Sequence, residues 1–216
     1  MPFNVNQTYN QAFRLIEQWR YRYSITRALP VFIKYWAYLH SGLYAPADEM
    51  VNESKFTEVA MPLTHLLQQL MMHGETDPLA RLLTEFCQGD SKHLAFFPTP
   101  SEVSHLIHAL TNSGRDISIA NRIYEPACGT AGISLESIEK LYFDNYNLDR
   151  PLGQISLVVE DIAETAIHSY FIQLLHKLQY LERVGQKSSV LKNVTISQVD
   201  VISRKAGTVH YILEAP

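Results

Sequence analysis

The chain lacks several features that would assign it to a class directly. Its 216 residues include only two cysteines, Cys87 and Cys128, which are too few for a disulfide framework and lack the His/Cys spacing of a zinc site. No run of about 18 apolar residues occurs, and the N-terminus lacks the basic-then-apolar order of a secretory signal. A formal charge of −4 argues against a freestanding DNA-binding protein with a broad basic face. We expect a globular, cytoplasmic protein without a membrane span or a metal ion.

The first 95 residues have helical periodicity, and 46% hydrophobic composition is ample for a packed core. Residues 10–43 predict two helices separated by a break at Leu29-Pro30, because proline disfavours helix at the residue before it. A third helix is predicted over 55–73 and a fourth over 77–87, with Asp77 as its N-cap. We expect an α-helical N-terminal domain over residues 1–95.

Residues 96–216 predict an α/β domain instead, because short β-branched runs alternate with longer helical segments. A nearly continuous apolar run at 155–160 is typical of a strand that is buried on both faces of a parallel sheet. The expected order is a helix over 101–112, a strand over 117–124, a glycine turn, a helix to about 143, a strand over 155–160, a helix over 163–183, and strands over 194–199 and 208–213.

The turn after the first of these strands carries two glycines, Gly129 and Gly132, which can adopt positive φ and bring the backbone close to a ligand. Glu125 precedes the turn and is placed at the carboxyl end of the strand, where open α/β sheets bind nucleotides. The spacing matches neither G-x-G-x-x-G nor G-x-x-x-x-G-K-[ST], which disfavours a pyrophosphate ligand. A ligand with an uncharged ribose, such as S-adenosylmethionine, fits better.

Residues 125–132 read Glu-Pro-Ala-Cys-Gly-Thr-Ala-Gly and resemble the first motif of the adenine-N6 DNA methyltransferases of type I restriction-modification systems. That family typically reads Asp-Pro-Ala-Cys-Gly-Thr-Gly-Gly, so Glu125 and Ala131 depart from it. Upstream, residues 95–100 read Ala-Phe-Phe-Pro-Thr-Pro and resemble the family's Gln-Phe-Phe-Thr-Pro with one residue inserted. The resemblance implies a partial Rossmann-like methyltransferase fold that binds S-adenosylmethionine.

The resemblance also implies the roles of individual residues in a cofactor pocket. Glu160 matches the acid that accepts hydrogen bonds from the ribose hydroxyls, and Asp200 matches an acid near the adenine. The adjacent Asp161 is better explained as an exposed acid that caps the next helix. The full set of expected cofactor-binding residues is Phe97, Thr99, Glu125, Ala127, Gly129, Gly132, Glu160 and Asp200.

The resemblance stops at the catalytic motif, Asn-Pro-Pro-Phe or Asn-Pro-Pro-Tyr, which in the family should follow the fourth strand. Here the chain reads Leu213-Glu-Ala-Pro216, so Ala215 or Glu214 stands where asparagine belongs. That asparagine and a proline carbonyl accept hydrogen bonds from the adenine amine, and the aromatic residue stacks on the flipped base. We therefore name no catalytic residue and expect either a shortened, inactive relative or a piece of a longer protein.

Partners are suggested by two features. A full methyltransferase sheet has seven strands, and only four are predicted, so a partner subunit or a second copy is expected to cover the open sheet edge. Near the N-terminus, basic residues alternate with aromatic ones, as in surfaces that meet phosphates and bases. A DNA-binding role would use Arg14, Arg20, Arg22 and Arg27; the alternative is an amphipathic helix with buried aromatics and solvated arginines.

Two other functions remain open. The chain can be a non-catalytic module that uses a degenerate methyltransferase fold to bind DNA or protein in a restriction-modification or mobile-element system. A small-molecule methyltransferase is less favoured, because the Phe-Phe-Pro-Thr-Pro segment and the helical domain resemble the DNA-modifying group.

Overall fold

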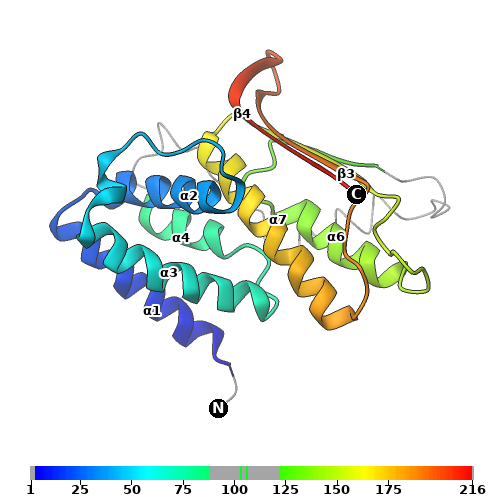
Figure 1. The fold of residues 1–216 in the computed structure, drawn as a ribbon, viewed down its shortest axis with the longest axis horizontal. Coiled ribbons are helices and arrows are strands. Elements are labelled where there is room, and N and C mark those ends of the chain that lie inside the picture. Colours follow the sequence, from blue (N-terminus) through cyan, green and yellow to red (C-terminus); the bar gives the residue numbers. More distant parts are fainter. Residues whose placement is uncertain (1–2, 88–102, 104–105, 107–121, 216) are drawn as a thin grey trace. The chain divides into compact units, whose positions relative to one another are not determined.

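The computed structural model describes residues 3–87, 103, 106 and 122–215, and the chain divides into two compact units, Met1–Phe97 and Pro98–Pro216 (Figure 1). We call them the N-terminal and the C-terminal unit and describe each by itself. The predicted helix over 101–112 and the start of the strand over 117–124 lie mostly or wholly outside the described residues.

The described part of the N-terminal unit is helical, as predicted. Its α-helices pack around aromatic side chains: Trp19 and Trp36 are buried, and the rings of Trp19 and Phe56 stack with centroids 5.2 Å apart. Burying large aromatic rings is a major source of stability in a unit of this size. The elements are α1 (Val5–Glu17), the 3₁₀ helix η1 (Gln18–Tyr21), α2 (Ile25–Ser41), η2 (Glu49–Asn52), α3 (Ser54–Met72) and α4 (Pro78–Cys87).

The predicted helix break at Pro30 is wrong. The chain leaves helical geometry earlier, at residues 22–24, and α2 then runs from Ile25 through Pro30 to Ser41. Pro30 is the sixth residue of α2, so its missing N–H removes one hydrogen bond near the helix start, where packing of a buried face outweighs the loss. The fourth helix is confirmed in detail: Ala80 N donates to Asp77 Oδ1 at 3.1 Å, so Asp77 caps α4.

The C-terminal unit contains one four-stranded sheet of order β1-β2-β3-β4. Strands β1 to β3 are parallel, and helices α6 and α7 form the crossovers between them. Both helices lie on the same face of the sheet (Figure 1), as right-handed crossovers require when strands add in one direction. The elements are β1 (Arg122–Pro126), α6 (Gly132–Asp144), β2 (Ser156–Asp161), α7 (Glu164–Gly185), β3 (Asn193–Asp200) and β4 (Lys205–Glu214).

The core of this unit lies between the sheet and its two helices. Leu157, Val159 and Ile196 project from the strands and are buried, and Phe171 of α7 stacks on Tyr211 of β4 with ring centroids 4.1 Å apart. Alternation puts the neighbouring strand residues on the opposite face. There, Tyr124 and Ile212 are 47% and 59% exposed.

The last strand departs from the expected position of a fourth methyltransferase strand. It pairs antiparallel with β3, with Asp200 opposite Lys205 and Asn193 opposite Glu214. Only four residues separate the two strands, too few for a crossover to a parallel strand, so the connection is a hairpin. Glu214 therefore lies at the amino end of β3, at the opposite edge of the sheet from the carboxyl ends of β1, β2 and β3.

Candidate functional site

The glycine turn after β1 is fastened to the end of the neighbouring strand β2. Cys128 N donates to the backbone oxygen of Glu160 at 2.9 Å, and Gly129 N donates to Asp161 Oδ2 at 2.8 Å. The turn, defined as residues 126–132, thus meets both acids of β2 at the carboxyl edge of the sheet. The turn and the end of β2 therefore lie side by side, and the Gly129 amide is used within the chain.

Asp161 is a structural link that the sequence did not reveal. Its Oδ1 accepts from Ala163 N at 2.8 Å, so it does cap α7 as expected, while its Oδ2 holds Gly129. The expectation that Asp161 is exposed is wrong, since its relative exposure is 8%. Consecutive strand residues point to opposite faces, so Glu160 and Asp161 necessarily serve different neighbours.

The turn has positive φ at two alanines, where this backbone is strained, and at Gly129, where it is not. Gly129 has a φ of 55°, the left-handed conformation that glycine adopts at low cost. Gly132 does not use this freedom, because it is the first residue of α6. Positive φ instead falls on Ala127, at 54°, and on Ala131, at 125°, where the related motif has glycine. Ala131 thus keeps a glycine-like backbone despite its Cβ.

Glu125 connects the end of β1 to the start of α6. It is 9% exposed, and its Oε2 accepts from Ser134 N at 3.0 Å, near the start of α6, where a negative charge is favoured by the helix dipole. The Ser134 hydroxyl hydrogen-bonds the hydroxyl of Tyr170, a fully buried residue of α7. Burial raises the pKa of Tyr170 well above its usual value, and the nearby charge of Glu125 adds to this. The acid is held by the scaffold.

A second contact from α7 fixes the middle of the turn. The side-chain amide of Gln173 donates to the backbone oxygen of Thr130 at 2.5 Å, and both residues are about 1% exposed. Tyr170 and Gln173 were not among the expected site residues.

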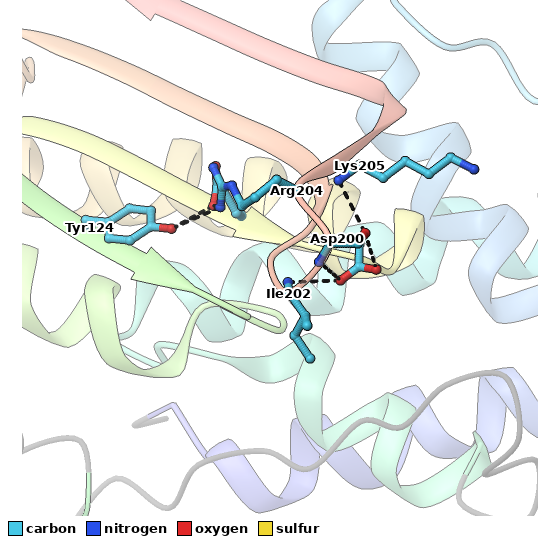
Figure 2. A network of polar contacts seen from close by, with 7 residues as sticks. Tyr124, Asp200, Ile202, Arg204 and Lys205 are labelled. Atoms are coloured by element: carbon cyan, nitrogen blue, oxygen red, sulfur yellow. Dashed lines mark hydrogen bonds and ion pairs between the residues drawn. The ribbon is translucent and has the colours of Figure 1, made fainter.

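Glu160, the expected ribose acceptor, accepts hydrogen bonds from a residue of β1 and a residue of the β3–β4 turn. Arg204 NH1 and NH2 donate to Glu160 Oε2 and Oε1 at 2.6 and 2.9 Å, and the Tyr124 hydroxyl donates to Oε2 at 2.7 Å. Figure 2 shows Tyr124 of β1 and Arg204 of the β3–β4 turn directed toward each other. Hydrogen bonding from Arg204 is the main cause of the lowered pKa of Glu160. Both carboxylate oxygens therefore have donors.

Asp200, the acid expected near the adenine, organises the β3–β4 turn. Its carboxylate accepts from Ile202 N at 3.0 Å and from the Ser203 hydroxyl at 2.6 Å (Figure 2). These bonds lower the pKa of Asp200, with the Ser203 hydroxyl as the largest contributor. Its backbone oxygen accepts from Arg204 N at 2.7 Å. Asp200 thereby positions the arginine that reaches Glu160.

The remaining expected site residues are less informative about a shared pocket. Phe97 and Thr99 lie outside the described residues. Three of the four arginines proposed for DNA form ion pairs within the N-terminal unit: Arg20 with Glu17, Arg22 with Glu53 and Arg27 with Asp48. Arg14 is exposed. With Trp19 and Trp36 buried, the geometry favours the amphipathic-helix interpretation of this stretch.

None of the helices in the described ranges is long and apolar enough to cross a membrane. Within the same ranges, no group of three or more His, Cys, Asp or Glu side chains is arranged to hold a metal ion.

One family model matches part of the chain. Residues 79–168 match the family model described as N-6 DNA methylase. This segment of the chain is therefore similar to the N-6 DNA methylases. The match spans less than half of the 216 residues, and it contains the turn, Glu125 and Glu160 but ends before β3 and Asp200. Neither the curated proteins nor the solved structures compared with the chain gave a match.

The similarity to N-6 DNA methylases makes S-adenosylmethionine the cofactor against which the residues of the site can be compared. The turn and the Glu160 carboxylate lie together at the carboxyl edge, where a nucleoside ligand of an open α/β sheet binds. The acceptor capacity of Glu160 is nevertheless taken up by Arg204 and Tyr124. The residues therefore fit the cofactor under one condition, which is that Arg204 yields its place on Glu160.

Proposed function

We propose that the chain is an adenine-N6 DNA methyltransferase-like protein that binds S-adenosylmethionine and does not transfer the methyl group by itself. The observation that carries this proposal is the hydrogen bond from Cys128 N to the Glu160 backbone at 2.9 Å, which places the turn beside the acid. Amino-acid and ribose moieties of one ligand could then contact neighbouring elements.

The cofactor, when bound, supplies an activated methyl group. In this proposal Glu160 accepts the ribose hydroxyls, the turn with Ala127, Gly129 and Gly132 receives the methionine end, and Glu125 supports that turn from its position under α6. Phe97 and Thr99 complete the proposed pocket, and Asp200 acts by holding the β3–β4 turn.

The absence of methyl transfer is argued from the position of β4. Glu214 and Ala215 stand where the family's asparagine is expected. Glu214 is the last residue of β4 and pairs with Asn193, and Ala215 follows it. That is the amino edge of the parallel strands, whereas Glu160 and the turn lie at the carboxyl edge. We expect no adenine methylation by the purified 216-residue protein, alone, on unmethylated DNA.

Calorimetric titration with S-adenosylmethionine and S-adenosylhomocysteine tests the proposal. We expect binding near micromolar strength, about 8 kcal/mol, that weakens at least about tenfold in Glu160→Gln because one carboxylate acceptor becomes an amide donor. The matched control is Asp149→Asn, which neutralises an exposed acid in the loop after α6. If no binding is detected up to millimolar ligand, the proposal is contradicted.

The alternative function is a non-catalytic interaction module of a restriction-modification or mobile-element system. The observation that favours it is the internal use of Glu125, Glu160 and Asp200, each of which already accepts hydrogen bonds from the chain. A module of this kind would bind a protein partner or a second copy along β4. Failure to bind either nucleoside, together with a concentration-dependent mass in sedimentation experiments, would favour it over the leading proposal.

DNA is the other proposed partner. The ion pairs of Arg20, Arg22 and Arg27 reduce the positive charge offered by the N-terminal unit, so we expect weak, salt-sensitive binding rather than tight sequence recognition. Fluorescence anisotropy of duplex DNA at two salt concentrations measures this. An Arg14→Gln variant that binds DNA as well as the parent would exclude the proposed contact between Arg14 and DNA.

A further inference from the structure

We propose that Arg204 competes with the ribose of the cofactor for the Glu160 carboxylate and so sets the affinity and ribose specificity of the pocket. The inference rests on the proposed function, because it concerns the same site. Its basis is geometric: one guanidinium presents two N–H donors to the two carboxylate oxygens, at 2.6 and 2.9 Å. A ribose presents two adjacent hydroxyl donors in a similar way.

The acid cannot serve both partners at once. A carboxylate offers about four acceptor positions, and Arg204 and Tyr124 occupy three of them. The side chain of Glu160 is only 10% exposed, so little room is left for a further pair of donors. A diol can enter only when the guanidinium leaves.

The backbone of Arg204 is held by a hydrogen bond, whereas its side chain is exposed to solvent. Its φ of 59° and the bond from its N–H to the Asp200 oxygen, at 2.7 Å, fix the turn. Asp200 also accepts from Ser203, which stabilises the same turn. The Arg204 side chain, by contrast, is 58% exposed, so the guanidinium can move into water when it is displaced. Because its backbone stays fixed, the Arg204 side chain remains close enough to bind Glu160 again when the ligand leaves.

Competition of this kind reduces apparent affinity by the fraction of time that the acid is free. It also selects the ligand, because only a compound that brings two hydroxyl donors replaces both guanidinium bonds. A 2′-deoxyribose brings one donor and replaces only one of the two guanidinium bonds, and losing a hydrogen bond is costly for a charged acceptor. We therefore expect discrimination against deoxyribose ligands that depends on Arg204.

The experiment is calorimetric titration of the whole chain and of Arg204→Gln with S-adenosylhomocysteine and with its 2′-deoxy analogue. The control Lys205→Gln removes the neighbouring positive charge of the same turn, but the Lys205 side chain makes no contact with Glu160 among the described residues. We expect Arg204→Gln to bind S-adenosylhomocysteine roughly three- to tenfold more tightly than the parent, and Lys205→Gln to bind as the parent does.

The outcomes separate the two proposals. Equal or weaker binding by Arg204→Gln would overturn the competition while leaving the cofactor site standing. No binding by the parent or by any variant would overturn both. A parent that does not distinguish ribose from 2′-deoxyribose, or an Arg204→Gln variant that distinguishes them as strongly as the parent does, would overturn the two-donor argument. NMR titration of the Glu160 carboxyl shows that Arg204→Gln is folded and that its guanidinium bonds to Glu160 are gone, because the pKa of Glu160 should rise in this variant.

Discussion

Asp161 Oδ2 lies 2.8 Å from the backbone nitrogen of Gly129, and the other oxygen of the same carboxylate lies 2.8 Å from the nitrogen of Ala163. One nearly buried side chain thus joins the glycine turn after β1 to the start of α7. The turn is held by a scaffold acid and does not depend on a ligand for its shape.

Replacing Asp161 should therefore loosen the turn. We expect Asp161→Ala to lower the free energy of unfolding by about 1 to 3 kcal/mol, because two backbone donors lose a charged acceptor. Urea unfolding measures the change, with Asp149→Ala as the control for loss of an exposed acid. Asp161→Asn keeps one acceptor oxygen and should fall between the two; an unchanged Asp161→Ala would contradict the link.

Ala131 gives a prediction of opposite sign. Its φ of 125° is a region that residues with a Cβ rarely adopt, so Ala131→Gly should raise the free energy of unfolding by about 1 kcal/mol. The control is Ala166→Gly in α7, where glycine should cost about 1 kcal/mol because the backbone is helical. Chemical denaturation of both variants distinguishes relief of strain from a general effect of glycine.

Gly185, the last residue of α7, is required for close packing. A Cβ at this position would overlap the ring of Tyr142, which is itself buried in α6. Helix propensity alone would favour alanine by about 1 kcal/mol, so the two effects differ in sign. We expect the overlap to win and Gly185→Ala to destabilise by about 1 to 3 kcal/mol, measured as a lower urea midpoint; a gain in stability would show that α6 and α7 are farther apart.

The Glu160–Arg204 pair predicts a pH dependence. Arg204 lowers the pKa of Glu160 in the folded chain, so its stabilising effect is complete above the unfolded pKa, about 4.3, and is lost as the pH falls through the folded value. The difference in unfolding free energy between the parent and Glu160→Gln should be constant from neutral pH to about 5 and shrink below about 4. A difference that does not change with pH would contradict the ion pair.

The sequence predicted most elements because each carried a local signal. Asp77 followed by Pro78 placed the start of α4, and the apolar run at 155–160 placed β2 to within one residue. Pro30 was misleading, since packing of α2 overrode a local preference. The sequence predicted the last strand only over 208–213, and the structure extends it back to Lys205, which leaves a hairpin connection of four residues.

The sequence predicted where the candidate site lies on the sheet, but it did not predict the hydrogen bonds within the site. Alternation and strand ends located Glu125, the turn and Glu160 at one edge. The partners of these groups, Arg204, Tyr170 and Gln173, come from elements 36 or more residues away along the chain. Such pairings depend on the three-dimensional packing of α7 and the β3–β4 hairpin, which no local pattern encodes.

The β3–β4 turn lies outside the packed core, and the side chains of Ile202 and Arg204 in this turn are largely exposed. It nevertheless carries the guanidinium that binds Glu160, the proposed ribose acceptor. Related chains that share the sheet and both helices could therefore differ widely in nucleoside affinity through a single codon in a surface turn. The nucleoside affinity of the proposed site can therefore change without a change in the sheet and helices that form the fold.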